Sequence, residues 1–333
     1  MGLEIVFDEP APFKLLSPKT LDEATELSAQ HGANAALLAG GCDLLDQLKH
    51  NWRRPAYVIN LKGISGLKGV SKDSNQLKLG ALTELDVVEH DSTVATLVPA
   101  LQMSAGRVAS PQIRNMATVG GNLLQDSRCS YYRSGFTCYR AGGIVCDAHH
   151  GLNAYHAIAG GDRCYTVTPS DLAPVMVALN ATVTIQSSGR SDELKAAELF
   201  VSPSQNIRRM TCLEPGQVLT GVAIPLVPGQ HSTFLKYAVR NTWDFGLASV
   251  AVSAQYSGGK YREWSVVFGS IAAVPWRSEG AEEALEGVQL NDQAIEAAAT
   301  AALAGAEPLS HNEYKVALSR KLLREALGNM ARS

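Results

Sequence analysis

The span Gln112–Asp171 constrains this chain more than any other stretch. It begins near a glycine-rich turn at Gly120-Gly121, then holds four of the chain's six cysteines, and ends at Asp171. Adjacent glycines let a backbone turn with positive φ and approach a ligand closely. Several thiols close together in a chain can bind zinc or an iron–sulfur cluster. A loop suited to phosphate beside a group of thiols therefore suggests redox chemistry.

Length and composition predict a globular protein of about two domains. The chain has 333 residues, of which 46% are hydrophobic and 18% charged, with a formal net charge of −3. Single hydrophobic cores stop growing at roughly 250–300 residues. No basic run is present, so we expect no nucleic-acid partner. No apolar run approaches the ~20 residues that cross a bilayer, so we expect no membrane span.

The N-terminal segment Met1–Asp8 contains acidic residues and lacks the basic and apolar regions of a signal peptide. We therefore expect a cytoplasmic protein, with export in complex with a signal-bearing partner left open. In a reducing compartment, cysteines serve more often as metal ligands or core residues than in disulfides.

Up to about residue 226 the patterns mix helices and strands. The apolar strand Ala35–Ala39 runs into Gly40-Gly41, and a helix follows over Leu44–Lys49. Strand, glycine turn and helix point backbone N–H groups at an anion. One such turn is more often only a tight turn, and it lacks the G-x-G-x-x-G spacing of dinucleotide folds. Together with Gly120-Gly121, however, it could hold a long ligand with two phosphates.

A composition change at Val227–Gln230 predicts a boundary between domains 1–226 and 230–333. Three strand patterns follow it, and Ser257-Gly258-Gly259-Lys260 predicts a hairpin turn between the last two. Helical patterns begin at about Glu279, Asp292 and Asn312. Three antiparallel strands followed by a layer of helices predict an α+β C-terminal domain.

The cysteines give the sharpest indication of chemistry. Four of them are separated by 8, 7 and 17 residues, with no C-x-x-C pair, which makes a zinc ribbon or finger less favoured. Zinc, an iron–sulfur cluster and unrelated buried thiols all remain open at this point, and a nearby histidine could replace a thiol around zinc. Cys42 and Cys212 have no other cysteine close to them in the sequence, so a place in the hydrophobic core is a better reading for both than a metal site. The four thiols are Cys129, Cys138, Cys146 and Cys164, and the nearby histidines are His149, His150 and His156.

Four charged residues have two readings each. Arg114 would suit a phosphate or a partner carboxylate. Asp171 follows Ser170 and precedes an apolar helix, so one of the two caps that helix, or Asp171 accepts from a ribose or ring hydroxyl. Lys236 and Arg240 share one face of a predicted strand, where they either face solvent or approach a flavin.

These residues together resemble the FAD-binding (medium) subunit of the molybdenum hydroxylases, the family of xanthine, aldehyde and carbon monoxide dehydrogenases. The resemblance implies a two-lobed FAD-binding domain of the vanillyl-alcohol-oxidase/molybdopterin-dehydrogenase type, with no catalytic residue of its own. It implies two FAD loops, an aspartate that bonds the cofactor and a lysine that reaches its ring system. The residues so implied to bind FAD are Leu38, Ala39, Gly40, Gly41, Cys42, Asp43, Leu44, Arg114, Thr118, Gly120, Gly121, Asn122, Asp171 and Lys236.

Most medium subunits run directly from the second loop to the aspartate segment, whereas this chain inserts the four cysteines at about residues 126–166. The insert is similar to that of a subgroup including periplasmic aldehyde oxidoreductase, whose flavin subunit carries an extra [4Fe-4S] cluster. The resemblance implies Cys129, Cys138, Cys146 and Cys164 as its ligands, so iron–sulfur is favoured over zinc.

The resemblance further implies an electron-transfer subunit of a heterotrimer. Substrate would be oxidised on a large subunit with a molybdenum cofactor, and a small [2Fe-2S] subunit would pass electrons to FAD. The external acceptor (NAD, quinone, oxygen or a protein) stays open. The competing hypotheses are a stand-alone flavin oxidoreductase of the same fold and a zinc-stapled interaction subunit without catalysis.

Overall fold

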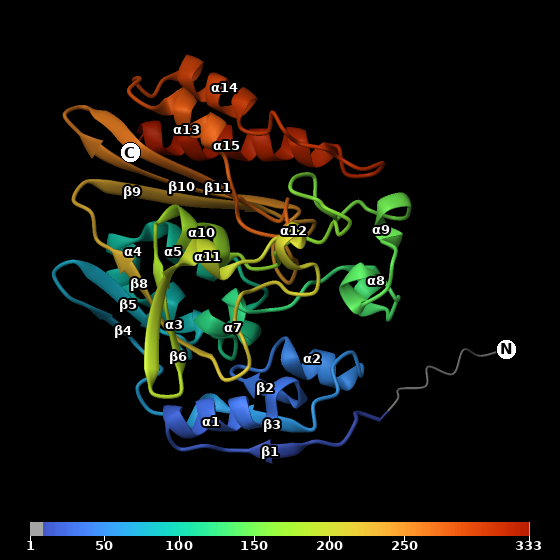
Figure 1. Cartoon of the computed structure of the whole chain (residues 1–333). Coiled ribbons are helices and arrows are strands. Elements are labelled where there is room, and N and C mark those ends of the chain that lie inside the picture. Colours follow the sequence, from blue (N-terminus) through green and yellow to red (C-terminus); the bar gives the residue numbers. More distant parts are fainter. Residues whose placement is uncertain (1–8, 333) are drawn as a thin grey trace.

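A computed structural model of the chain describes residues 9–332. The segment Met1–Asp8, on which the signal-peptide expectation depends, lies outside the described residues. Three β-sheets follow one another from the N-terminal to the C-terminal end of the molecule, each with helices beside it (Figure 1). The cysteine insert projects along one side, around α8 (Ser130–Arg133) and α9 (Asp147–His150).

The first lobe is a small parallel sheet in the order β1-β3-β2. Thr20 begins the first helix as predicted, because its hydroxyl accepts from the Glu23 N–H at 3.2 Å. The predicted strand–turn–helix around Gly40 is confirmed, whereas the first strand was not predicted. The elements are β1 (Lys14–Leu16), α1 (Leu21–His31), η1 (Gly32–Asn34), β2 (Ala35–Leu38), α2 (Leu44–Lys49), β3 (Tyr57–Asn60) and η2 (Leu61–Gly63).

The second lobe is a five-stranded antiparallel sheet in the order β4-β5-β8-β6-β7. Its strands are β4 (Val70–Lys72), β5 (Gln76–Gly80), β6 (Thr182–Ser187), β7 (Arg190–Lys195) and β8 (Val218–Pro225). Its helices are α3 (Leu85–His90), α4 (Ser92–Leu97), α5 (Pro99–Gly106), α6 (Pro111–Arg114), α7 (Val119–Leu123), α10 (Leu172–Ala178), α11 (Ala196–Leu199) and α12 (Pro203–Asn206). The apolar α10 is buried along nearly its whole length, which explains its lack of a polar face.

Thr83 shortly precedes α3 but does not cap it. Its hydroxyl instead accepts from the Gly69 N–H at 2.9 Å and donates to the Gly69 carbonyl, and α3 begins two residues later without a side-chain cap. The Gly69 backbone therefore binds the hydroxyl group that could otherwise have capped the helix.

The C-terminal sheet is antiparallel, in the order β12-β11-β10-β9, with helices on one face and α5 and α10 against its other side. The predicted α+β class and the hairpin turn are confirmed, and Gly258 and Gly259 both have positive φ. A fourth strand of two residues was not predicted. The elements are β9 (Gln230–Tyr237), β10 (Ala248–Ser257), β11 (Lys260–Gly269), β12 (Trp276–Arg277), α13 (Glu279–Leu285), α14 (Asp292–Ala301) and α15 (Tyr314–Arg332).

The insert contains only short helical turns, α8, α9 and η3 (Tyr139–Ala141), joined by loops. Its place between α7 and α10 puts it beside the second glycine turn on one side and the C-terminal sheet on the other. Across the residues that the structure describes, no helix is both long and apolar enough to span a bilayer.

Candidate functional site

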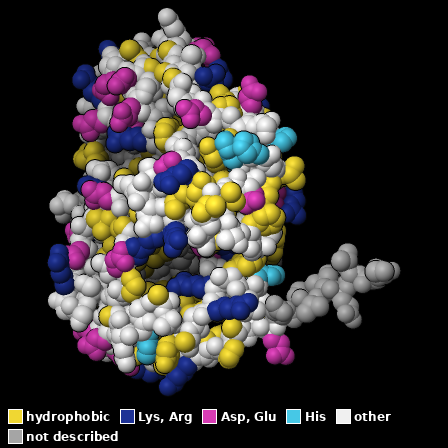
Figure 2. All heavy atoms as spheres, turned by 45° about the vertical axis from the view of Figure 1, so that its right-hand side comes forward, with side chains coloured by type: hydrophobic (Ala, Val, Ile, Leu, Met, Phe, Trp, Pro, Cys, Tyr) yellow, Lys and Arg dark blue, Asp and Glu magenta, His cyan; other side chains and the backbone are white. Residues whose placement is uncertain are grey.

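One cavity of about 340 Å³ collects both glycine turns. Its volume lies within the range of roughly 300–1,000 Å³ that small-molecule and cofactor sites occupy. The face in Figure 2 is hollowed near its middle, with Lys and Arg side chains at the rim. Of the predicted cofactor residues, those that line the cavity are Ala39, Gly40, Gly41, Cys42, Asp43, Leu44, Thr118, Gly120, Gly121, Asn122, Asp171 and Lys236.

The first glycine turn lies against the segment that leads into the second, and close packing of the backbone explains one glycine in each turn. A Cβ atom on Gly40 would lie 1.9 Å from the Met116 carbonyl oxygen. A Cβ atom on Gly120 would lie 3.0 Å from both the Ala81 Cβ and the Ala81 carbonyl oxygen. Gly41 has a φ of +87°, which side chains rarely allow. The close approach of the two backbones thus forms one floor for the cavity.

The turns differ in what their N–H groups do. In the second turn, Gly120 donates to the Ala81 carbonyl at 2.8 Å and Gly121 donates to the Thr118 hydroxyl at 3.1 Å. In the first turn, the N–H groups of Gly41 and Cys42 have no acceptor in another of the described residues. Unpaired N–H groups at a cavity and ahead of a helix are suited to an anion. The first turn is therefore the candidate phosphate loop, and the second supports it.

A buried ion pair closes the cavity opposite the turns. The Lys236 Nζ lies 2.5 Å from an Asp171 carboxylate oxygen, and the two side chains are 2% and 5% exposed. Lys236 also donates to the Arg107 carbonyl at 3.0 Å. Burial raises the pKa of Asp171 above its usual range, and the ammonium of Lys236 opposes that rise.

The two readings of Asp171 are resolved by its neighbour. Ser170 caps α10, since its hydroxyl accepts from the Ala173 N–H at 3.0 Å. The Ser170 hydroxyl also donates to the Asn122 side chain at 2.6 Å. Asn122 thereby ties the second turn to the aspartate segment, and the Asp171 carboxylate is left to face the cavity and Lys236.

Arg114 does not line the cavity, so we withdraw it from the cofactor-binding set. Its guanidinium is buried and contacts Glu89 at 2.6 Å, which confirms the reading of a partner carboxylate. Leu38 does not line the large cavity either, whereas its neighbour Leu37 does. Arg240 lies beyond the end of β9, where it is exposed and paired with Asp244 at 2.6 Å, so it does not share a strand face with Lys236.

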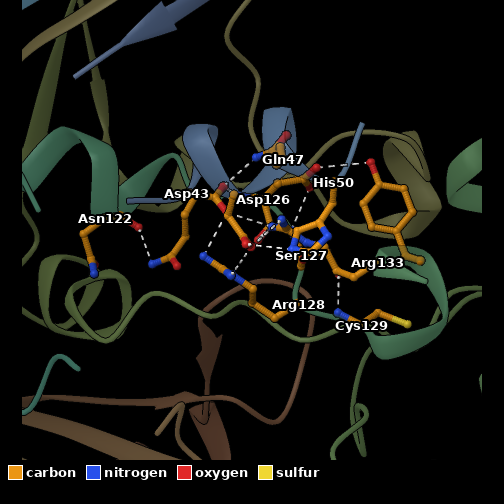
Figure 3. Close-up of polar contacts among 12 residues, drawn as sticks. Asp43, Gln47, His50, Asn122, Asp126, Ser127, Arg128, Cys129 and Arg133 are labelled. Carbon is orange, nitrogen blue, oxygen red and sulfur yellow. Dashed lines mark hydrogen bonds and ion pairs between the residues drawn. The ribbon is translucent and has the colours of Figure 1, made fainter. Parts of the chain in front are cut away.

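Asp43 links the first turn to the insert. Its carboxylate contacts Arg128 at 2.9 Å and Arg133 at 2.8 Å, and it accepts from the Asp126 N–H at 2.8 Å. Figure 3 shows these residues together with Gln47, whose amide donates to the same carboxylate at 2.8 Å. Sequence analysis missed this role, because the arginines lie some 85 residues further along the chain.

The residues that line the cavity without having been predicted include a cation and two aromatic side chains, Arg128, Trp243 and Phe245. The Arg128 guanidinium lies over the Phe245 ring, 5.1 Å from its centroid. The aromatic pair follows Lys236 closely in the chain, and that proximity was the available signal.

The four thiols of the insert meet at a second, smaller cavity of about 10 Å³. All are free, and Cys138 and Cys164 are buried. Burial raises the pKa of Cys129, and it raises that of Cys164 to about 11. Within the part of the chain that the structure describes, these thiols do not form a set of three ligand atoms within 4.8 Å of one another.

Of the three nearby histidines, His156 lines the thiol cavity. Its Nε2 lies 3.2 Å from the Cys129 Sγ. Burial, with the Lys315 ammonium adding to it, lowers the pKa of His156 to about 4. His149 instead stacks on Tyr165 with ring centroids 5.0 Å apart, and His150 is exposed.

The partly exposed Asp126 pairs with the buried Arg140 beside the thiols. Burial favours the neutral carboxyl, but the ion pair with Arg140 outweighs it and lowers the pKa of Asp126. Arg140 also lines the thiol cavity, as does Asp147, so a cation and a carboxylate both lie beside the thiols.

Comparison with known proteins gives matches over nearly the whole chain. Residues 11–227 match the family described as the FAD binding domain in molybdopterin dehydrogenase. Residues 233–330 match the CO dehydrogenase flavoprotein C-terminal domain. The aldehyde oxidoreductase FAD-binding subunit of Escherichia coli (strain K12) is 33% identical over 309 residues, which is 90% of this chain and 93% of that protein.

Carbon monoxide dehydrogenases also match. The medium chain from Hydrogenophaga pseudoflava is 24% identical over 322 residues, 96% of each protein. A solved carbon monoxide dehydrogenase from the same organism, lacking the Mo-pyranopterin moiety of the molybdenum cofactor, is similar with a TM-score of 0.76. It has 25% sequence identity and covers 96% of this chain and 98% of that chain.

Proposed function

Since the chain belongs to the FAD-binding medium subunits of the molybdenum hydroxylase family, we propose that it is the FAD- and [4Fe-4S]-carrying electron-transfer subunit of such an enzyme. Its relatives are FAD subunits of dehydrogenases and oxidoreductases. The observation that carries the finer proposal is the adjacency of the two cavities. Arg128 lines the large cavity, and the next residue, Cys129, lines the thiol cavity.

FAD fits the large cavity in chemistry as well as in size. The unpaired N–H groups of Gly41 and Cys42 would hold its pyrophosphate. Asp171 would accept from a hydroxyl, and Lys236 would bring positive charge to the ring system. The flavin supplies the capacity to exchange electrons one or two at a time. The chain's own residues bind it, orient it and place a buried cation beside it.

The donor set at the second cavity supports an iron–sulfur cluster. Four thiolates around one zinc ion with Zn–S near 2.3 Å lie about 3.8 Å apart, whereas thiolates bound to four different irons lie further apart. The thiols of the insert are not drawn that closely together. All four thiols line this one cavity of about 10 Å³, which is smaller than a cubane and would have to widen to hold one.

The proposal requires partners. Each [2Fe-2S] cluster takes about four ligands, and only Cys42 and Cys212 remain outside the insert. A small [2Fe-2S] subunit and a large subunit with the molybdenum cofactor would therefore complete the path from substrate to FAD. Electrons would leave to an external acceptor. A cytoplasmic location, with export through a signal-bearing partner as the alternative, belongs to the same proposal.

Metal and flavin analysis of the purified chain tests the proposal. We expect one FAD and about four irons per chain, with a visible spectrum showing both flavin and cluster absorbance. A Cys138→Ser/Cys146→Ser double variant should keep FAD and lose the iron. Stoichiometric zinc in place of iron would favour the zinc-stapled alternative. Turnover of an electron donor by the isolated chain would favour a stand-alone flavin oxidoreductase.

A further inference from the structure

His156 is the one histidine of the insert whose ring meets a candidate cluster ligand. The residue is 4% exposed, and its Nε2 lies 3.2 Å from the Cys129 Sγ. The other ring nitrogen, Nδ1, is buried without a hydrogen-bond partner among the described residues. The ring is therefore held toward the sulfur by the buried groups packed around it.

The C-terminal helical layer holds the backbone on which His156 sits. The buried Asn312 amide donates to the His156 carbonyl at 3.0 Å and to the Ala157 carbonyl at 3.1 Å. Lys315, at the start of α15, donates to the Tyr155 carbonyl at 3.0 Å and to the Ser270 carbonyl at 2.8 Å. Both side chains have no exposed surface. A fixed backbone and a close-packed ring leave the imidazole little freedom.

The direction of the hydrogen bond follows from the acceptor. A thiolate bound to iron has no hydrogen, so it can only accept. The Nε2–H tautomer and the protonated ring both present a donor to the sulfur. The remaining tautomer would set two lone pairs against each other at 3.2 Å. Donation from Nε2–H is thus the arrangement compatible with a bound cluster.

We propose that His156 is a positioning residue that donates an Nε2–H hydrogen bond to the Cys129 thiolate, held in place by Asn312 and Lys315, and so raises the reduction potential of the cluster. The inference rests on the proposed [4Fe-4S] function. Adding one electron makes the cluster more negative, and a donor at a ligand sulfur stabilises the more negative state more strongly. The hydrogen bond therefore makes the cluster easier to reduce.

Redox titration of the full chain, followed by the electron paramagnetic resonance of the reduced cluster, tests the inference. In His156→Leu the midpoint potential should become more negative, so that at the wild-type midpoint the ratio of reduced to oxidised cluster falls on the order of tenfold. His156→Gln restores an N–H donor and should titrate close to wild type. His150→Leu, the same change on an exposed histidine of the insert, should leave the potential unchanged.

If the cluster of His156→Leu has the same midpoint potential as that of wild type, the inference is wrong and the proposed function still stands. A wild-type chain without a four-iron signal would overturn both. If His156→Leu assembles no cluster, the wild-type protein labelled with ¹⁵N-histidine decides by electron–nuclear double resonance. A weak nitrogen coupling of hydrogen-bond strength supports the inference, whereas no coupling, or the strong coupling of a direct ligand, overturns it.

Discussion

At the scale of single residues, burial and partners decide what each charged group does. Asp171, Asp43 and Asp126 are all aspartates near the two cavities, yet each is paired differently. Asp171 pairs with a lysine inside the large cavity, whereas the other two pair with arginines that join the insert to the rest of the chain. Asp171 and Asp43 each line the cavity together with a cationic partner, Lys236 and Arg128, whereas Asp126 does not line it.

Replacing Lys236 with methionine tests the buried pair. Lys236→Met keeps most of the side-chain volume but leaves the Asp171 carboxylate buried without its cation. Breaking such a pair costs about 3–5 kcal/mol, and the cavity also loses its positive charge. We expect a lower free energy of unfolding in denaturant titrations and a lower ratio of flavin to protein after purification.

The matched control is Arg240→Met, which removes a cation from an exposed ion pair on the neighbouring loop. Exposed pairs contribute little to stability because water screens them, so the stability and flavin content of this variant should stay close to wild type. Equal flavin retention in both variants would contradict the role given to Lys236.

Lys315 predicts a dependence of stability on pH in the metal-free chain. Burial lowers the pKa of Lys315 from 10.5 to about 7 in the folded state, with the His156 imidazole as its titratable neighbour. Between pH 7 and about 10 the unfolded chain therefore binds the extra proton. Stability from this group rises with pH across that window and is constant below it.

The measurement compares wild type with Lys315→Met by urea unfolding at several pH values. From pH 7 to 10, the unfolding free energy of wild type should rise relative to that of Lys315→Met by on the order of 4 kcal/mol. A difference that stays constant across the window would show that the buried amine keeps its ordinary pKa.

At the scale of elements, the cavity depends on two turns that come from different lobes and meet backbone to backbone. The first turn precedes α2, and the second lies within α7. Gly40 permits their contact, because its place for a Cβ lies 1.9 Å from the Met116 carbonyl oxygen. Asp43 then extends the contact to the insert through Arg128 and Arg133. One short segment thus contacts both the large cavity and the insert that carries the thiols.

Gly40→Ala should force the two turns apart. The added methyl meets backbone rather than a flexible side chain, so the turns must shift and the N–H groups of the first turn move with them. We expect an apparent FAD dissociation constant at least tenfold weaker, measured by flavin fluorescence on refilling the flavin-free chain. Gly305→Ala is the control, since nothing lies within 4 Å of its added Cβ, and it should bind FAD as wild type does. Unchanged FAD binding by Gly40→Ala would contradict the packing described for the turns.

At the scale of the whole molecule, the thiols of the insert lie outside the main hydrophobic cores, whereas Ile158 of the insert belongs to the second. The largest core joins the five-stranded sheet with α5 and α10, and a second lies between the C-terminal sheet and its helices. None of the four thiols of the insert belongs to either core. The FAD scaffold should therefore stay folded when the cluster is absent.

Cys146→Ser tests this independence, because Cys146 is partly exposed and its change removes one ligand without opening a core. We expect iron content to fall sharply while the flavin content and the far-ultraviolet circular dichroism stay close to wild type. Removing iron from the wild-type chain with a chelator should give the same result. Loss of flavin together with iron would show that the cluster holds the FAD cavity in shape.

The sequence by itself determined the fold class, the family and the places of the two glycine turns and four cysteines. These depend on local patterns: glycines that allow close backbone approach, alternating strands, and caps such as Thr20. The α+β class and the family are confirmed, whereas the domain limits and the iron–sulfur ligands stay predictions.

Tertiary structure alone decided which partner each polar group takes. Arg114 pairs with Glu89, Ser170 rather than Asp171 caps its helix, and Asp43 reaches arginines far along the chain. His156 meets Cys129 because Asn312 and Lys315, more than 150 residues later, hold its backbone. Hydrogen bonds and ion pairs depend on distances of a few ångströms, which only the packing of remote elements sets.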